Sequence, residues 1–185
     1  MPGQYSLAKC VFLTIDSATT SGVALSEPNI NSQGVVRGYE VNSHAEVTSQ
    51  ESRHQWVRDA LEVSRDRKLP LVIVGEMWPP MGRPVLVTLA ELWGMWRAAF
   101  EYEGALRTAH VVRVNPNTWR AAVFGKKRPV KTAELKKHAV QYVHRKFGEP
   151  LLISDNIAEA LCIRVWAERS TEVHELLAPK RKKAA

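Results

Sequence analysis

Two short apolar runs constrain the fold of this chain more than any other feature of its sequence. Residues 10–15 and 71–75 are almost continuously apolar and rich in β-forming side chains, a pattern typical of strands that are buried on both faces. Such a sheet requires helices packed against each side. Because 185 residues supply one core of this kind but not two of ordinary size, we expect a single α/β domain over residues 1–179, followed by a basic, disordered tail at 180–185.

The remaining pattern completes a five-stranded mixed sheet. Strands are expected at 10–15, 23–25, 35–41, 71–75 and 110–114. Short turns join the first three, which predicts an antiparallel meander, and the others add parallel strands. Helical spacing predicts helices at 56–64, 86–100, 119–124, 135–143 and 155–168, with loops at 28–32 and 77–84. The expected architecture is therefore a mixed five-stranded sheet flanked by helices.

Positive charge is concentrated in one part of the chain. Residues 104–148 hold 11 basic side chains and a single acidic one, whereas residues 1–103 hold 9 basic and 12 acidic. Such a one-sided segment favours a polyanionic partner, most often nucleic acid, over the alternative of a solvated basic helix face. The side chains expected to contact nucleic acid are Lys126, Lys127, Arg128, Lys131, Lys136, Arg120 and Arg83.

The cysteine content and the apolar pattern indicate the compartment. Cys10 and Cys162 both lie in apolar runs and are expected to be buried free thiols. Two thiols cannot form a disulfide framework or a four-thiolate zinc site. No apolar stretch approaches the roughly 18 residues of a membrane span, and the first residues show no secretory signal pattern. These observations favour a cytoplasmic protein with no membrane partner.

Four acidic residues are placed differently from the rest. Asp16 and Glu76 each end an apolar strand, and Asp155 and Glu159 are four residues apart on one face of a predicted helix. Sites in mixed sheets gather at the ends of central strands. Carboxylates brought together there repel unless a cation neutralises them, and oxygen ligands favour Mg²⁺ or Mn²⁺. Turn or helix capping could explain Asp16 and Asp155 singly, but the joint placement predicts a metal site.

Four segments together resemble the RuvC-like Holliday-junction resolvases of the RNase H-like superfamily. They are Ile15-Asp16 with its turn to SGVAL at 21–25, VGEMW at 74–78, NPNTWR at 115–120, and DNIAEAL at 155–161. The 115–120 segment, followed by a Lys-rich helix, looks like the phage-borne branch. The resemblance covers about residues 9–168. It implies an RNase H-like fold and a homodimeric, metal-dependent endonuclease that nicks four-way (Holliday) or branched DNA junctions symmetrically.

The same resemblance assigns the acids. It implies that Asp16, Glu76, Asp155 and Glu159 hold two Mg²⁺ ions, for which Mn²⁺ can substitute, with Asp16 as the bridge. The family usually carries an acid three residues before its last carboxylate, where this chain has Asn156. Either Asn156, through its amide oxygen, or the preceding Asp155 is expected to take that place.

The sequence leaves two alternatives open for each of two aromatic features, a loop tryptophan and a tryptophan-containing helix. Trp78 follows Glu76 in the proline-rich loop and is expected to stack on an unpaired base of a junction, with burial in the core as the alternative. The helix with Leu86, Trp93 and Trp96 offers apolar side chains either to a dimer partner or to the core.

Three other functions remain to be weighed against a junction resolvase. One is an RNase H-like nuclease acting on RNA or hybrid duplex. Another is a catalytically inactive DNA-binding module, for which Asn156 is the best argument. A third is an actin-like kinase or ATPase, because residues 16–22 resemble its phosphate-binding turn; that fold needs two domains, which 185 residues cannot supply.

Overall fold

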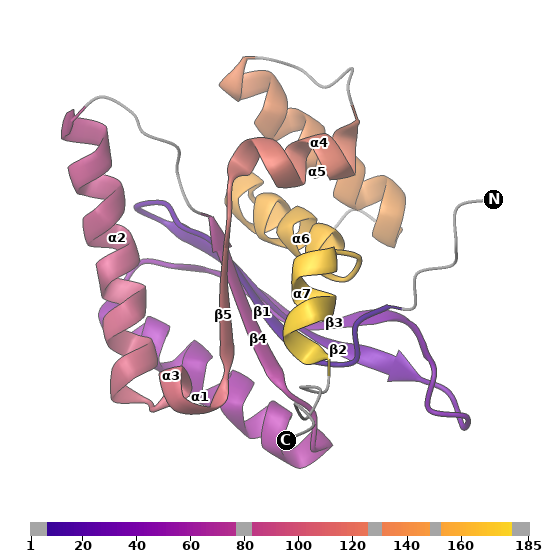
Figure 1. Cartoon of the computed structure of the whole chain (residues 1–185). Coiled ribbons are helices and arrows are strands. Elements are labelled where there is room, and N and C mark those ends of the chain that lie inside the picture. Colours follow the sequence, from indigo (N-terminus) through magenta and orange to yellow (C-terminus); the bar gives the residue numbers. More distant parts are fainter. Residues whose placement is uncertain (1–6, 77–82, 126–130, 149–152, 179–185) are drawn as a thin grey trace, which may run out of the picture.

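Five strands form one mixed sheet in the part of the chain that the computed structural model describes, residues 7–76, 83–125, 131–148 and 153–178 (Figure 1). The strands are β1 (Val11–Asp16), β2 (Ser21–Ile30), β3 (Val36–Val47), β4 (Leu71–Glu76) and β5 (His110–Val114). Their spatial order is β3-β2-β1-β4-β5. Strands β1 to β3 form an antiparallel meander, and β4 and β5 extend it in parallel with β1. The mixed sheet expected from the sequence is confirmed.

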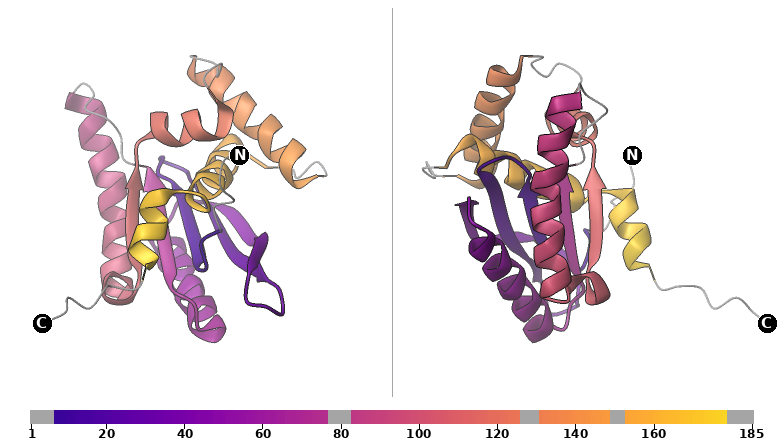
Figure 2. Two further views of the ribbon diagram at one scale, coloured as in Figure 1. Left: turned by 45° about the vertical axis from the view of Figure 1, so that its right-hand side comes forward. Right: turned by 90° about the vertical axis from the view of Figure 1, so that its left-hand side faces the viewer.

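The helices form a layer on each face of this sheet. One layer holds α1 (Gln50–Arg67), α2 (Arg83–Tyr102) and α3 (Ala105–Thr108). The other holds α4 (Pro116–Phe124), α5 (Thr132–Phe147), α6 (Asp155–Ala167) and α7 (Thr171–Leu177). The right-hand view of Figure 2 shows α1 and α7 on opposite sides of the sheet.

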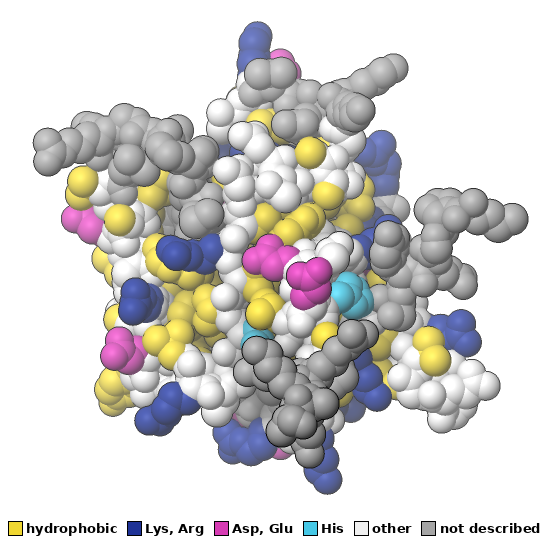
Figure 3. All heavy atoms as spheres, viewed as in Figure 1, with side chains coloured by type: hydrophobic (Ala, Val, Ile, Leu, Met, Phe, Trp, Pro, Cys, Tyr) yellow, Lys and Arg dark blue, Asp and Glu magenta, His cyan; other side chains and the backbone are white. Residues whose placement is uncertain are grey.

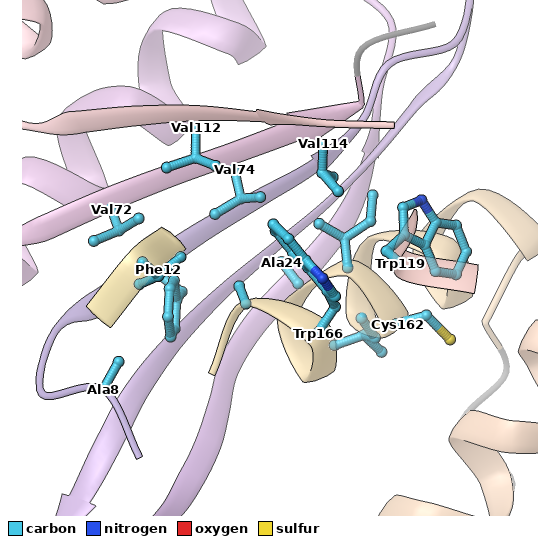
Figure 4. Close-up of a cluster of buried hydrophobic side chains, with 14 of the residues drawn as sticks. Ala8, Phe12, Ala24, Val72, Val74, Val112, Val114, Trp119, Cys162 and Trp166 are labelled. Carbon is cyan, nitrogen blue, oxygen red and sulfur yellow. The ribbon is translucent and has the colours of Figure 1, made fainter. Parts of the chain in front are cut away.

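Each central strand contributes to both cores, because successive side chains point to opposite faces. Phe12 and Val74 lie among the side chains that meet the α6 layer (Figure 4), whereas Leu13, Ile15 and Ile73 pack against the α1 and α2 layer. All of these side chains are fully buried. This double burial explains why β1 and β4 are continuously apolar rather than alternating.

Helix α6 lies at the centre of its layer and is buried on nearly all sides. It contacts the sheet beneath it and α4 and α5 beside it, so an amphipathic pattern is not required. The sheet accommodates its first turn through Gly22, where a Cβ atom would lie 2.0 Å from the backbone oxygen of Asn156. Only glycine permits this approach, which brings the start of α6 close to the end of β1.

The structure corrects the expected element bounds in two loops. Strand β2 continues through Pro28 to Ile30, where a loop was expected, and Pro28 pairs with Tyr39 of β3. Beyond Ser26, β2 pairs with β3 but not with β1 in the described sheet, and proline is tolerated in a strand that is paired on one side only. Pro84 was expected in the loop before α2 but lies in the first helical turn, where no intrahelical N–H bond is needed.

Two short helices were not predicted. Helix α3 has 4 residues and helix α7 has 7, so neither carries enough periodicity to be recognised in the sequence. The helix expected to be the last is therefore followed by α7, whose Val173 packs into the core beneath α6.

Other expectations concern the thiols and the membrane. Cys10 and Cys162 are free and buried, as predicted. Among the described helices, none combines the length and the hydropathy needed to cross a bilayer.

Candidate active site

Three buried carboxylates lie close to one another where two central strands end. Strands β1 and β4 are parallel neighbours with Ile15 opposite Gly75, so Asp16 and Glu76 follow at the same level of the sheet. The alternation of side chains directs both toward the α6 layer, which contributes Glu159. Asp16, Glu76 and Glu159 are 3%, 2% and 4% exposed. The structure thus brings together three of the four acids singled out in the sequence.

Burial and mutual repulsion perturb two of these carboxyl groups. The pKa of Asp16 is raised well above its usual value by burial and then by the charges of Glu76 and Glu159, against the opposing effect of Lys136 and Arg120. Burial also raises the pKa of Glu76 to about 7, although Arg120 and a hydrogen bond from Trp119 oppose the shift. The site therefore holds more buried negative charge than its own cations neutralise.

Helix α4 supplies the partners of these carboxylates. Asn115 caps the helix by accepting a hydrogen bond from the Asn117 backbone, and Pro116 occupies the first turn. This start, directly after β5, places Trp119 so that its Nε1–H donates to Glu76 Oε1 at 2.6 Å. This role of Trp119 was not predicted from the sequence, although the residue lies inside the 115–120 segment.

Arg120 lies within the site rather than on an open surface. Its Nη2 atom is 2.7 Å from Glu159 Oε1 and 3.7 Å from Glu76 Oε1. Its side chain is 11% exposed and lies over the Trp119 ring. In this conformation two carboxylates bind the guanidinium, and the expected DNA contact of Arg120 stays a prediction.

The first turn of α6 carries the fourth acid and its neighbour. The cap of this helix is Ser154, which accepts a hydrogen bond from the Ile157 backbone, so Asp155 is not the cap. The Asp155 carboxylate forms a 2.6 Å ion pair with Lys136 of α5, and its side chain is 37% exposed. Lys136 also lies 3.5 Å from Asn156 Oδ1. Lys136 thus contacts both alternatives for the third metal ligand, and the choice between them stays open.

A further acid, Glu46, approaches the same place from β3. Its Oε1 accepts a hydrogen bond of 3.1 Å from Asn156 Nδ2. The register runs from Asp16 to Gly22 and from Gly22 to Glu46, so these positions face the same side of the sheet. Glu46 was not predicted from the sequence, because its position near Asn156 depends on the register between β2 and β3, which pairs it with Gly22.

The donor chemistry fits a hard divalent cation, although no closed metal cage is present. Glu76 Oε2 is buried without a hydrogen-bond partner among the described residues, and the charges of Glu76 and Glu159 both act on Asp16. Yet within the described ranges no group of three or more His, Cys, Asp or Glu side chains is arranged to hold a metal ion. The guanidinium of Arg120, between Glu76 and Glu159, occupies the place of a cation.

The remaining residues expected to bind DNA are only partly described. Lys131 is exposed directly before α5. Arg83 is the first residue of α2, but its side chain lies outside the described residues. Trp78 and the basic cluster at 126–128 also lie outside them, so their expected roles stay predictions.

Comparison with known proteins shows the fold. No protein-family model and no curated protein sequence matches the chain. Among solved structures, it is similar to RuvC of Thermus thermophilus in complex with a Holliday junction substrate, with a TM-score of 0.56 and 15% identity. A structure of the same protein described without that substrate gives a TM-score of 0.51 and 17% identity. Both alignments cover 83% of this chain and 90% of the other. The RNase H-like fold predicted from the sequence is therefore confirmed.

Proposed function

We propose that this protein is a divalent-metal-dependent endonuclease that cuts four-way or branched DNA junctions. The observation that carries the proposal is the group of three buried carboxylates, Asp16, Glu76 and Glu159, at adjacent strand ends beneath α6. They occur on a fold that RuvC, solved with a Holliday junction, also has. The pKa values of Asp16 and Glu76 are raised chiefly by burial, and carboxyl groups with perturbed pKa values cluster at functional sites.

Each residue near the carboxylates has a proposed role. Asp16, Glu76 and Glu159 would hold two Mg²⁺ or Mn²⁺ ions, and Asp155 or Asn156 would complete the set. When bound, such ions supply an activated water and stabilise the leaving 3′ oxygen. Trp119 orients Glu76 through its 2.6 Å hydrogen bond.

DNA would lie along the basic side of the site. Lys136 is half-exposed beside Asp155, and its pKa is raised by Asp155, Glu159 and Asp16 despite the opposing effect of burial, so it stays cationic at the rim. With Lys131 and the sequence-predicted cluster at 126–128, it would neutralise backbone phosphates. Trp78 would stack on an unpaired base.

A second copy of the chain is the proposed partner, because two symmetric nicks require two sites. Trp96 does not contribute to an interface: it is fully buried and donates a 3.1 Å hydrogen bond to Ser21 Oγ. Helix α2 instead exposes Val87, Met95 and Tyr102, whose spacings of eight and seven residues place them on one side of the helix. Apolar side chains among charged ones are visible over α2 at the left of Figure 3.

The direct test compares the wild type with Asp16→Asn on a synthetic four-way junction, a linear DNA duplex and an RNA–DNA hybrid. We expect the wild type to nick the junction with Mg²⁺ or Mn²⁺, and Asp16→Asn to bind the junction without cutting it. Robust cutting by Asp16→Asn would refute the catalytic assignment. Preference for the hybrid would favour the RNase H-like alternative, and junction binding without cutting by the wild type would favour an inactive binding module.

The basic cluster is tested separately. Changing Lys126, Lys127 and Arg128 together to alanine should weaken junction binding and flatten its dependence on salt, because fewer counterions are released. The measurement is the dissociation constant over a series of salt concentrations. Unchanged affinity and slope would remove the cluster from the interface.

A further inference from the structure

Arg120 provides the positive charge that two of the proposed metal ligands share. A single atom, Nη2, contacts the Oε1 atoms of both Glu159 and Glu76. Those carboxylates are almost completely buried, and an unpaired carboxylate in such surroundings is strongly unfavourable. The guanidinium is therefore the counter-charge that makes the burial of Glu76 and Glu159 tolerable.

A divalent cation would bind the same two carboxylates and would neutralise the same negative charge. Arg120 hydrogen-bonds Glu159 and forms a longer ion pair with Glu76. A metal ion held by these carboxylates would be repelled by the guanidinium, so Arg120 and the ion compete for them. The guanidinium is only partly satisfied by the carboxylates. Its Nη2 donates to Glu159, whereas its Nε is buried and has no hydrogen-bond partner among the described residues. The present pairing thus leaves part of the donor fork unused, and a phosphate group, which accepts two parallel N–H bonds, matches that fork better.

We infer that Arg120 is an exchangeable counter-charge: it neutralises Glu76 and Glu159 while DNA is absent, and transfers to a DNA phosphate when the substrate binds, which leaves the two carboxylates free for the metal ion. This inference rests on the proposed nuclease function. It adds that the free protein resists metal loading and that binding of DNA phosphates relieves the resistance. Arg120 is also close in sequence to the side chains proposed to bind DNA. Helix α4 ends at Phe124, and the basic cluster at 126–128 follows in the sequence.

The exchange makes a prediction for metal affinity that does not depend on catalysis. In the absence of DNA, Arg120→Gln should bind Mn²⁺ about tenfold to a hundredfold more tightly than the wild type, because a charge-assisted hydrogen bond of about 1.5–3 kcal/mol no longer competes. Isothermal titration calorimetry with Mn²⁺ alone measures the dissociation constant. Arg145→Gln, which removes an exposed guanidinium from α5, is the matched control and should bind Mn²⁺ like the wild type.

A second variant keeps the test valid if Arg120→Gln does not fold. Arg120→Lys retains the charge, so its Mn²⁺ affinity should stay within a few-fold of that of the wild type. In the wild type, the Arg120 Nε–H signal in ¹⁵N NMR, identified by its loss in Arg120→Lys, should shift when junction DNA is added without any divalent metal. A signal that does not respond to DNA would overturn the inference.

The outcomes separate this inference from the proposed function. Equal or weaker Mn²⁺ binding by folded Arg120→Gln, in a protein that nicks junctions, would refute the exchange and leave the nuclease assignment intact. Failure of the wild type to bind Mn²⁺ in both the absence and the presence of junction DNA would refute the proposed metal site and the exchange with it.

Discussion

Replacing Glu76 by glutamine should change how the stability of the metal-free protein depends on pH. Burial raises the pKa of Glu76 in the folded protein from 4.5 to about 7. Between these values the folded state keeps a proton that the unfolded state has released, so the free energy of unfolding falls as the pH rises. A shift of this size corresponds to about 3 kcal/mol, at about 1.4 kcal/mol for each pH unit. Glutamine is neutral throughout and is of nearly the same shape.

The measurement is urea unfolding followed by circular dichroism between pH 4 and pH 8, with a chelator present. Relative to Glu76→Gln, the wild type should be most stable below pH 4.5 and should lose about 3 kcal/mol by pH 8. Removing Glu76 also relieves Asp16 of a repelling charge, which acts in the same direction. Adding Mg²⁺ at pH 8 should restore stability to the wild type more than to the variant.

Glu62→Gln, at an exposed position of α1, serves as the control and should follow the wild-type pH profile. Parallel profiles of the wild type and Glu76→Gln would refute the reasoning, because they would mean that the Glu76 carboxyl group titrates alike in the folded and unfolded states. A wild type that gains stability relative to the variant as the pH rises would refute it as well.

Two further substitutions test the packing of α6 and the proposed interface. Gly22→Ala places a Cβ atom 2.0 Å from the Asn156 backbone oxygen, so it should lower the free energy of unfolding by about 1–3 kcal/mol; Gly38→Ala, with open space around it, is the control in the same urea titration. Met95→Glu should convert a dimer into a monomer in sedimentation velocity, whereas Leu176→Glu, an exposed apolar position on α7, should not; a dimer that withstands Met95→Glu would rule out this face.

The positions of the acids at the strand ends could be predicted from short sequence patterns. The apolar runs before Asp16 and Glu76 predicted two buried strands, and their parallel pairing at one edge follows from the order of elements. Four-residue spacing placed Glu159 on the same helix as Asp155. These inferences succeed because burial on both faces and helical periodicity are properties of short segments.

The partners of the carboxylates depend on contacts between distant segments. From the sequence, Arg120 was expected to be a DNA-contacting residue of a basic segment, yet it lies between the buried carboxylates of Glu76 and Glu159. Asp155 and Glu159 looked equivalent in spacing, but one is half-exposed beside Lys136 and the other is buried. A one-dimensional charge pattern cannot distinguish these cases, because burial depends on which elements cover the position.

The sequence by itself determined that this chain is an α/β protein with acids at the ends of its central strands and with most of its positive charge in one later segment. Only the tertiary structure decided how those charges meet. Gly22 lets α6 approach the sheet closely, and α4 turns from β5 over Glu76. The strength of each charge–charge interaction depends on the distance between the groups and on their exposure to solvent. Both are set by how the helices pack on the sheet.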